Sequence, residues 1–188
     1  LNMYEDYPFW HALFTTAGFE VMLSSESVFS RYETALGSVM SDNICFPAKL
    51  VHAHVKELDE RLSAPDMPAG AFIFMPYVVY ERQDDTRNTN SYNCPIVSAY
   101  SDVIRSAMTL HARLDSPVIN FRDEKLLVRQ LTGYLRGLGI DRQTIRRACR
   151  QAAAAQDEYT RLVRQKALDL LAASRREGRL TILLAGRP

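Results

Sequence analysis

Hydrophobic positions along the chain follow two patterns: continuous apolar runs of strand length, and apolar residues spaced for one face of a helix. Ala71–Met75 is a continuous apolar run, which is typical of a strand that is covered on both faces. After Pro47 the pattern changes, and an amphipathic helix is predicted from apolar residues that recur every three or four positions, Val51, Val55, Leu58 and Leu62. Strand-like and helix-like segments in alternation favour a parallel sheet flanked by helices.

The same criteria predict the other elements. Strands are expected at Phe19–Leu23, Ala71–Met75, Pro117–Phe121 and Leu180–Ala185. Helices are expected at Pro8–Gly18, Ser27–Gly37, Pro47–Leu62, Pro95–Met108, Asp123–Leu138 and Asp141–Glu177. Asp123 and Asp141 are suited to cap the last two helices, and Gly178 is placed to end the final one. We therefore predict the α/β class, with a Rossmann-like, mostly parallel sheet, flanking helices and a long C-terminal helix.

We expect three parts along the chain. A Rossmann-like α/β domain would occupy residues 1–140 and a long helix residues 141–178. Residues 179–188 would be the first strand of a following, truncated domain or a strand that returns to the sheet. Because the chain does not begin with Met and ends in a turn signal after an apolar segment, we expect a fragment of a larger multidomain protein.

Charge and composition exclude several classes of function. The 188 residues carry 23 basic and 22 acidic side chains, a net charge of +1, which offers no electrostatic basis for binding nucleic acid or an anionic membrane. No apolar run approaches the roughly 20 residues that span a bilayer. Three cysteines are an odd number and too few for a disulfide framework, so a reducing, cytoplasmic compartment is expected.

Two of the cysteines stand at matching places. Cys45 ends a polar run and Cys94 ends a long polar loop, and a proline opens a helix directly after each, at Pro47 and Pro95. The free N–H groups and the positive dipole end of a helix N-terminus favour a thiolate there. Two thiolates that converge from separate loops would suit an iron–sulfur cluster or another soft metal. Their spacing of 49 residues is no metal-binding signature, however, and from the residues alone two partly buried free cysteines are the favoured explanation.

Other candidate groups have simpler explanations. Cys149 lies on an apolar helical stripe and is expected to pack in a core or interface. His52 and His54 point in different directions on one helix, so they are expected to be structural or exposed, although one could bond to the cysteine loop. Acidic residues of the loop between residues 80 and 93 could act as acids or bases but are better explained as a solvated loop: Glu81, Asp84 and Asp85. Neither of the two glycine-rich motifs that bind nucleotide phosphates, G-x-G-x-x-G and G-x-x-x-x-G-K-[ST], occurs in the sequence.

Four short stretches together resemble a known family. They are Leu1-Asn-Met-Tyr-Glu-Asp-Tyr-Pro-Phe-Trp10, Cys45-Phe-Pro-Ala-Lys-Leu-Val-His52, Tyr92-Asn-Cys94-Pro-Ile-Val97 and Ala185-Gly-Arg-Pro188. With them the whole chain resembles the domain that accompanies activase modules in large proteins of the 2-hydroxyacyl-CoA dehydratase and benzoyl-CoA reductase group. The related dehydratase subunits are anaerobic enzymes that hold a [4Fe-4S] cluster through three cysteines and receive an electron from an ATP-hydrolysing activase.

This resemblance implies roles for particular residues. Cys45 and Cys94 match the first two cluster-binding positions, and the third cysteine is expected in a further domain beyond Ala185-Gly-Arg-Pro188, since Cys149 does not match it. ATP and magnesium are expected only on other domains. The expected partners are activase modules and dehydratase-type domains of the same or a partner chain. An acyl-CoA substrate is left open, and nucleic acid and membrane are not expected.

Three hypotheses follow from these observations. The first is a dehydratase-like domain that contributes part of a [4Fe-4S] site for ATP-driven, low-potential electron transfer; the cluster is expected in the full-length parent, and this fragment is expected to be inactive alone. The second is a non-catalytic structural or docking module that links activase and dehydratase components through the helix at 141–177. The third is a two-cysteine zinc or redox site. Ligands of one cubane should lie within about 7 Å of each other.

Overall fold

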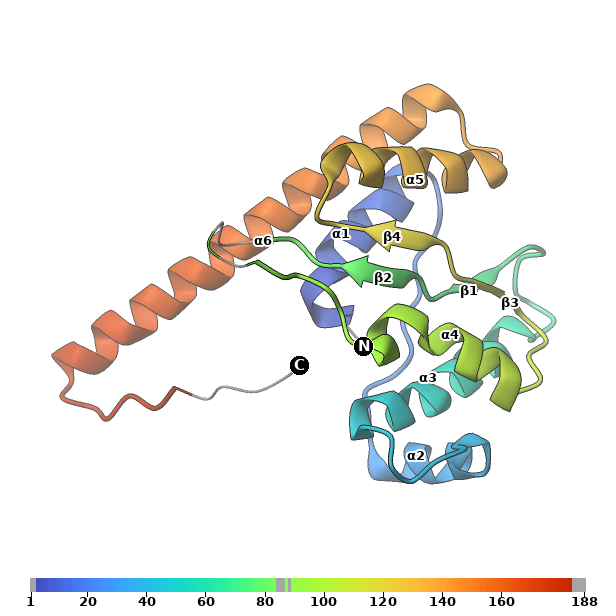
Figure 1. Ribbon diagram of the computed structural model, residues 1–188, viewed down its shortest axis with the longest axis horizontal. Helices are drawn as coiled ribbons and strands as arrows, with labels where there is room; N and C mark the ends of the chain where they lie inside the picture. The colour runs from blue at the N-terminus through green and yellow to red at the C-terminus, as the bar shows by residue number, and fades with distance from the viewer. Residues whose placement is uncertain (1–2, 84–86, 88, 184–188) are drawn as a thin grey trace. The chain divides into compact units, whose positions relative to one another are not determined.

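The computed structural model describes residues 3–83, 87 and 89–183 and has a mixed α/β architecture with parallel strands (Figure 1). In chain order its elements are α1 (Met3–Thr16), α2 (Phe29–Ala35), the 3₁₀ helix η1 (Leu36–Ser38), α3 (Phe46–Leu62), β1 (Phe72–Phe74), β2 (Tyr77–Tyr80), α4 (Pro95–Ala107), β3 (Arg113–Asp115), β4 (Val118–Asn120), α5 (Glu124–Gly137) and α6 (Arg142–Arg176). The predicted α/β class and the long C-terminal helix are confirmed. No helix among the described residues has the length and apolar character needed to cross a membrane.

The described chain forms two compact units. Residues 22–138 make up one of them, which we call the inner unit. The other consists of residues 3–21 together with 139–183, and we call it the terminal-helix unit. The predicted division at residues 140 and 178 stays a prediction.

The strands of the inner unit form a narrow parallel ribbon that is interrupted once. β1 pairs with β3 and β2 with β4, both in parallel. Pro76 and Pro117 separate the two pairs, yet the ribbon continues across them, because Met75 N–H donates to the Asp115 carbonyl at 2.8 Å and Tyr77 N–H to the Pro117 carbonyl at 3.0 Å. The buried centre of the ribbon consists of Ile73, Val78 and Ile119.

Helices cover both faces of this ribbon, with α5 on one face and α3 and α4 on the other (Figure 1). Apolar residues of α3, α4 and β1 form one core cluster, made of Ala48, Val55, Ile73, Tyr100 and Ile104. Arg105 of α4 holds the interrupted part of the ribbon, because its guanidinium donates to the Leu114 carbonyl at 3.0 Å, to Ser116 Oγ at 2.8 Å and to Tyr77 Oη at 2.9 Å. Apolar packing and the Arg105 side chain therefore hold α4 against β2 and β3.

A buried carboxylate joins α3 to the segment before β3. Asp59 is only 6% exposed. Its Oδ1 accepts from the backbone N–H groups of His111 at 2.8 Å and Ala112 at 2.7 Å, and its Oδ2 lies 3.1 Å from His111 Nδ1. Buried charge is tolerated when it is hydrogen-bonded in this way.

The terminal-helix unit pairs α1 with the first half of α6. The α1 side of the contact buries Phe9, Leu13 and Phe14. The α6 side buries Ile145, Ala148, Cys149, Ala152 and Gln156. Asp141 caps α6 as predicted, accepting from Gln143 N–H at 2.8 Å and Thr144 N–H at 3.0 Å, and Gly178 follows its end with a φ of 60°. The second half of α6 leaves apolar side chains exposed: Leu162, Val163, Leu168, Leu170 and Leu171.

Some predicted elements differ from the structure. Phe19–Leu23 is not a strand; Phe19 instead makes an edge-to-face contact with Phe14, at 5.7 Å between ring centroids. The first helix begins at Met3, so Pro8 lies inside it. The strand β2 was not predicted. No strand forms over residues 180–183, and the rest of the predicted Leu180–Ala185 segment lies outside the described residues.

Candidate functional site

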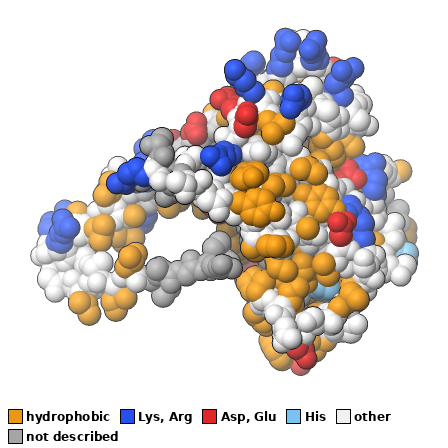
Figure 2. Space-filling model, viewed as in Figure 1, with side chains coloured by type: hydrophobic (Ala, Val, Ile, Leu, Met, Phe, Trp, Pro, Cys, Tyr) orange, Lys and Arg blue, Asp and Glu red, His pale blue; other side chains and the backbone are white. Residues whose placement is uncertain are grey.

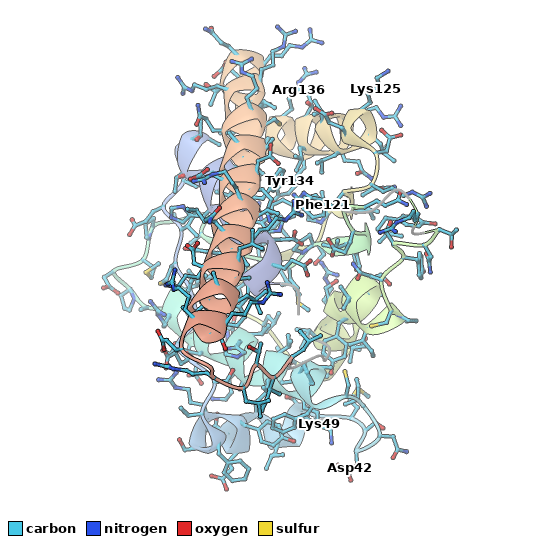
Figure 3. All side chains as sticks on the ribbon, turned by 90° about the vertical axis from the view of Figure 1, so that its left-hand side faces the viewer. Asp42, Lys49, Phe121, Lys125, Tyr134 and Arg136 are labelled. Atoms are coloured by element: carbon cyan, nitrogen blue, oxygen red, sulfur yellow. The ribbon has the colours of Figure 1, made fainter. Side chains whose placement is uncertain are left out.

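Cys45 is the N-cap of α3. The polar run before it ends in extended backbone, with φ −61° and ψ 145° at Cys45, and Pro47 stands in the first helical turn. The Cys45 carbonyl accepts the helix N–H groups of Ala48 at 3.1 Å and Lys49 at 3.3 Å, whereas its side chain makes no capping bond. The thiol is exposed and free. Figure 3 labels Asp42 and Lys49 at this end of the helix, where Lys49 Nζ donates to the Asp42 carbonyl at 2.9 Å.

Cys94 has the same position in α4. It is the N-cap, with φ −63° and ψ 156°, and Pro95 is the first residue of the helix. Its carbonyl accepts from Val97 N–H at 3.0 Å and Ser98 N–H at 3.1 Å, and its side chain again makes no capping bond. The thiol is free and half-buried. Both sulfurs therefore belong to residues that begin a helix, where a negative charge is favoured.

The helices that begin at the two cysteines share one core. Ile44, directly before Cys45, and Ile96, two residues after Cys94, both pack against the cluster that contains Ala48 and Tyr100. In addition, burial and, second, the charge of Cys45 raise the pKa of Tyr100 in α4. The residues beside both helix starts thus pack against the same cluster. The separation of the sulfurs stays a prediction.

His52 of α3 is fully buried. Its Nε2 is 2.9 Å from Tyr100 Oη, and its Nδ1 is 2.9 Å from Ser38 Oγ. Ser38 Oγ also donates to the Ala35 carbonyl at 2.8 Å. Burial lowers the pKa of His52. The expectation that His52 is structural is therefore correct, but sequence gave no indication of its hydrogen bond to Tyr100.

His54 faces the chain before α2 instead. Its two ring nitrogens lie 2.9 Å from Ser24 Oγ and 2.8 Å from Ser27 Oγ. One turn further on, Glu57 accepts from Ser25 N–H at 3.0 Å and Ser25 Oγ at 2.7 Å. Burial is the largest cause that lowers the pKa of His54, and the bond from Ser25 is the largest cause that lowers that of Glu57. Both side chains hold the segment 24–27 on α3.

The polar loop before Cys94 is pinned at its base. Tyr80 and Tyr92 form an antiparallel bridge, and Glu81 N–H donates to the Ser91 carbonyl at 2.9 Å. Asn93 Nδ2 donates to the Val78 carbonyl at 3.0 Å and to Glu81 Oε1 at 2.8 Å. Glu81 is thus a structural partner of the residue that precedes Cys94. Two other candidates of this loop, Asp84 and Asp85, lie outside the described residues.

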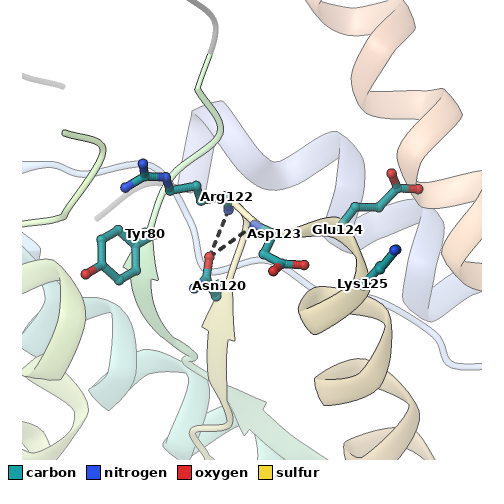
Figure 4. A pocket seen from close by; sticks show the side chains of 6 residues that line it. All are labelled: Tyr80, Asn120, Arg122, Asp123, Glu124 and Lys125. Atoms are coloured by element: carbon teal, nitrogen blue, oxygen red, sulfur yellow. Dashed lines mark hydrogen bonds between the residues drawn. The ribbon is translucent and has the colours of Figure 1, made fainter. Parts of the chain in front are cut away.

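A shallow hollow lies at the carboxyl ends of β2 and β4, next to the start of α5 (Figure 4). Its lining is Tyr80, Asn120, Arg122, Asp123, Glu124 and Lys125. Asn120 Oδ1 accepts from Arg122 N–H at 2.9 Å, and Asp123 caps α5 by accepting from Leu126 N–H at 2.9 Å. No cysteine is among these lining residues.

The donor set indicates which kind of metal could fit at the helix starts. Cys45 and Cys94 are free and unused in capping, so they offer two soft ligands. Over residues 3–83, 87 and 89–183, no three side chains of His, Cys, Asp or Glu gather as a metal-binding group. Two thiolates are fewer than the four protein ligands that a [4Fe-4S] cluster usually takes. Cys149 is buried under α1, where burial raises the pKa of its thiol, as expected for packing.

Apolar side chains gather on the surface near Cys45. In Figure 2 they cover the part of the inner unit that contains α2 and the start of α3. The exposed members of this group are Phe29, Leu36, Met40 and Phe46. Tyr32 lies between two of them, with ring centroids 5.4 Å from Phe46 and 6.1 Å from Phe29. Phe46 directly follows Cys45 in the chain.

Comparison with known proteins places the whole chain in one group of sequences. Residues 1–188 match the family described as CoA enzyme activase uncharacterised domain. Neither a curated protein nor a solved structure matches the chain.

Proposed function

Because the chain belongs to this family of CoA enzyme activase domains, we propose that it is part of a CoA-substrate-specific activase or 2-hydroxyacyl-CoA dehydratase-like protein and supplies two ligands of a [4Fe-4S] site. The ligands are Cys45 and Cys94. When bound, such a cluster carries single electrons at low potential. In this proposal ATP and magnesium bind on other domains, whose hydrolysis reaction drives the electron transfer, and the protein is cytoplasmic, where thiols stay reduced.

One observation supports the proposal: two helices that are each N-capped by a free cysteine pack into the same core cluster, and Ile44 and Ile96, one and two residues from the cysteines, pack against it. Each cysteine uses its carbonyl to start the helix and leaves its sulfur free to bind. The helix N-termini favour negative charge, which suits a thiolate and an anionic cluster. Asn93 fixes the backbone that enters Cys94.

The experiment is anaerobic reconstitution, with iron and sulfide, of the protein that carries this chain. Cys45→Ala and Cys94→Ala are each expected to lower iron and sulfide per chain and to weaken the visible absorption of the cluster. Cys149→Ala is the matched control, because this third thiol is buried and packs under α1, and its iron content should stay unchanged. Unchanged iron and sulfide in both ligand variants would overturn the proposal.

A second candidate function is a docking module that links activase and dehydratase components. It is favoured by the exposed apolar residues on the second half of α6, among them Val163 and Leu170. These two are seven residues apart and so share one face of the helix. Leu168 is equally exposed but lies on another face.

These positions allow a matched comparison. If α6 is a docking surface, Val163→Glu and Leu170→Glu abolish binding to separately produced activase modules in a pull-down, whereas Leu168→Glu leaves it intact. The docking role is wrong if all three variants bind as the unmodified chain does. Because none of these residues is near the thiols in sequence or in the same compact unit, iron content is expected to be independent of them.

A further inference from the structure

Three buried or half-buried side chains form a continuous hydrogen-bonded chain below the two helix starts. Tyr100 Oη lies 2.9 Å from His52 Nε2, and His52 Nδ1 lies 2.9 Å from Ser38 Oγ. His52 is 0% exposed and Tyr100 2% exposed, so water does not compete for the bond between these two side chains. The two rings meet nearly edge to face, with an interplanar angle of 76°.

Ser38, at one end of this hydrogen-bonded series, determines which atom donates in each bond. Ser38 spends its hydroxyl hydrogen on the Ala35 carbonyl, so its oxygen must accept from His52 Nδ1–H. His52 Nε2 then carries the lone pair and accepts from the Tyr100 hydroxyl. Burial lowers the pKa of His52 and so favours this neutral form. Each bond of the chain has one donor and one acceptor, and none is in conflict.

Each member of the chain stands on a segment that leads to or from a cysteine. Ser38 is in η1, seven residues before Cys45, and His52 is in α3, seven residues after it. Seven residues are almost two helical turns, so His52 lies on the same side of α3 as its N-cap, about 10 Å further along. Tyr100 is in α4, six residues after Cys94.

We propose that the Ser38–His52–Tyr100 chain sets the separation of the Cys45 and Cys94 sulfurs, which makes His52 and Tyr100 positioning residues for a metal held by the two thiolates. Apolar side chains such as Val55 and Ile104 pack in the same cluster, but apolar contacts are non-directional and allow α3 to shift along α4. A hydrogen bond between buried partners is directional, so a shift of α3 along α4 would leave a buried donor and a buried acceptor unpaired. The inference rests on the proposed function for its metal, but not for the geometry of the thiols.

The first test is independent of any metal. In a Cys149→Ala background, the two remaining thiols are cross-linked with bifunctional thiol reagents of graded span. In the Cys149→Ala protein the cross-linking yield should depend sharply on the length of the reagent. Tyr100→Phe, which removes only the hydroxyl, should make the yield depend less sharply on that length. Tyr134→Phe is the matched control, because it removes a hydroxyl bonded to Asp115 Oδ2 at 2.9 Å elsewhere in the inner unit. Melting curves verify that each variant is folded, and Ser38→Ala replaces Tyr100→Phe if the latter does not fold.

The second test measures Co²⁺ binding from its absorption spectrum. Tyr100→Phe is expected to weaken binding about tenfold, the lower end of what loss of a supporting bond costs a metal site. His52→Gln, whose amide oxygen can accept from Tyr100, should bind more tightly than His52→Leu. Tyr134→Phe should bind as the unmodified chain does.

The two tests separate the two claims. If the cross-linking profiles differ but the whole protein that carries this chain binds no Co²⁺, the ligand proposal fails and the positioning role stands. If the unmodified chain binds Co²⁺ and the Tyr100→Phe and Tyr134→Phe variants match it in both measurements, the positioning role is wrong and the ligand proposal stands.

Discussion

Asp59 and Ala112 are joined by a hydrogen bond of 2.7 Å from the backbone N–H of Ala112 to the Asp59 carboxylate, across 53 residues of sequence. Because the carboxylate also accepts the His111 N–H, Asp59→Ala leaves two backbone donors without their acceptor. We expect a loss of about 2 kcal/mol in the free energy of unfolding, measured by urea denaturation. The neighbouring Glu60→Ala removes an exposed pair with Lys56 and should cost less than about 0.5 kcal/mol. Equal losses in both variants would contradict this role of Asp59.

The three thiols should differ in reactivity. Cys45 is exposed and Cys94 half-buried, whereas Cys149 is buried and burial raises the pKa of its thiol. Because the thiolate is the reacting species, a disulfide-forming reagent should modify two thiols per native chain rapidly and the third only after unfolding. Cys149→Ala should keep the rapid phase and lose the slow one. A rapid phase of three thiols in the native chain would show that α1 does not protect Cys149.

The free energy of unfolding should fall as the pH is lowered through the range in which the histidines of the unfolded chain take up protons. Burial lowers the pKa of His52 from 6.5, so below that pH the unfolded chain binds a proton that the folded chain excludes. The free energy of unfolding then decreases with falling pH, by at most about 1.4 kcal/mol per pH unit for one proton. His54, whose pKa is also lowered, adds to the slope.

Urea denaturation between about pH 7.5 and 5.5, above the range where carboxylates titrate, measures this slope. His52→Gln should make it shallower and leave the part that His54 contributes. A slope that is the same in the variant would mean that His52 does not exclude a proton in the folded state.

Arg105 should be sensitive even to a conservative change. Its guanidinium reaches the Leu114 carbonyl, Ser116 Oγ and Tyr77 Oη at once, which the single ammonium of a lysine cannot do. Arg105→Lys is therefore expected to lower the free energy of unfolding by about 1 kcal/mol. The measurement is the melting temperature, which should fall. Arg161→Lys, in an exposed pair with Glu158 on α6, is the control and should change little. A larger effect at Arg161 than at Arg105 would refute the claim.

Local chemistry made the helix starts predictable. Cys45 and Cys94 each end a polar run, and Pro47 and Pro95 suit the first turn of a helix, so the sequence specified both N-caps without tertiary information. Asp141 was recognisable as a cap for the same reason. In contrast, nothing near His52 in sequence indicates Tyr100, its partner 48 residues away, because both occupy ordinary apolar helix positions.

The strands were harder to predict, for reasons visible in the ribbon. The predicted strand ended with the apolar run at Met75, but β2 begins at Tyr77, directly after Pro76. Met75 and Tyr77 bond toward the neighbouring strand, so the proline between them lacks an N–H only on the outer edge, where none is needed. Phe19–Leu23 has the composition of a strand but no partner strand, and Phe19 packs on Phe14 instead. Pairing partners are a property of the whole fold and are not encoded locally.

The contact between α1 and α6 has a consequence for biosynthesis. Gln156 donates to the Glu5 carbonyl at 2.9 Å, so the bond joins residues 151 positions apart. During translation, α1 is made first, but the face of α6 that covers Phe9 and Leu13 follows only after the inner unit, on the order of ten seconds later. For that interval the apolar side chains of α1 lack the helix that buries them in the finished fold, so the nascent chain is exposed to aggregation until α6 is complete.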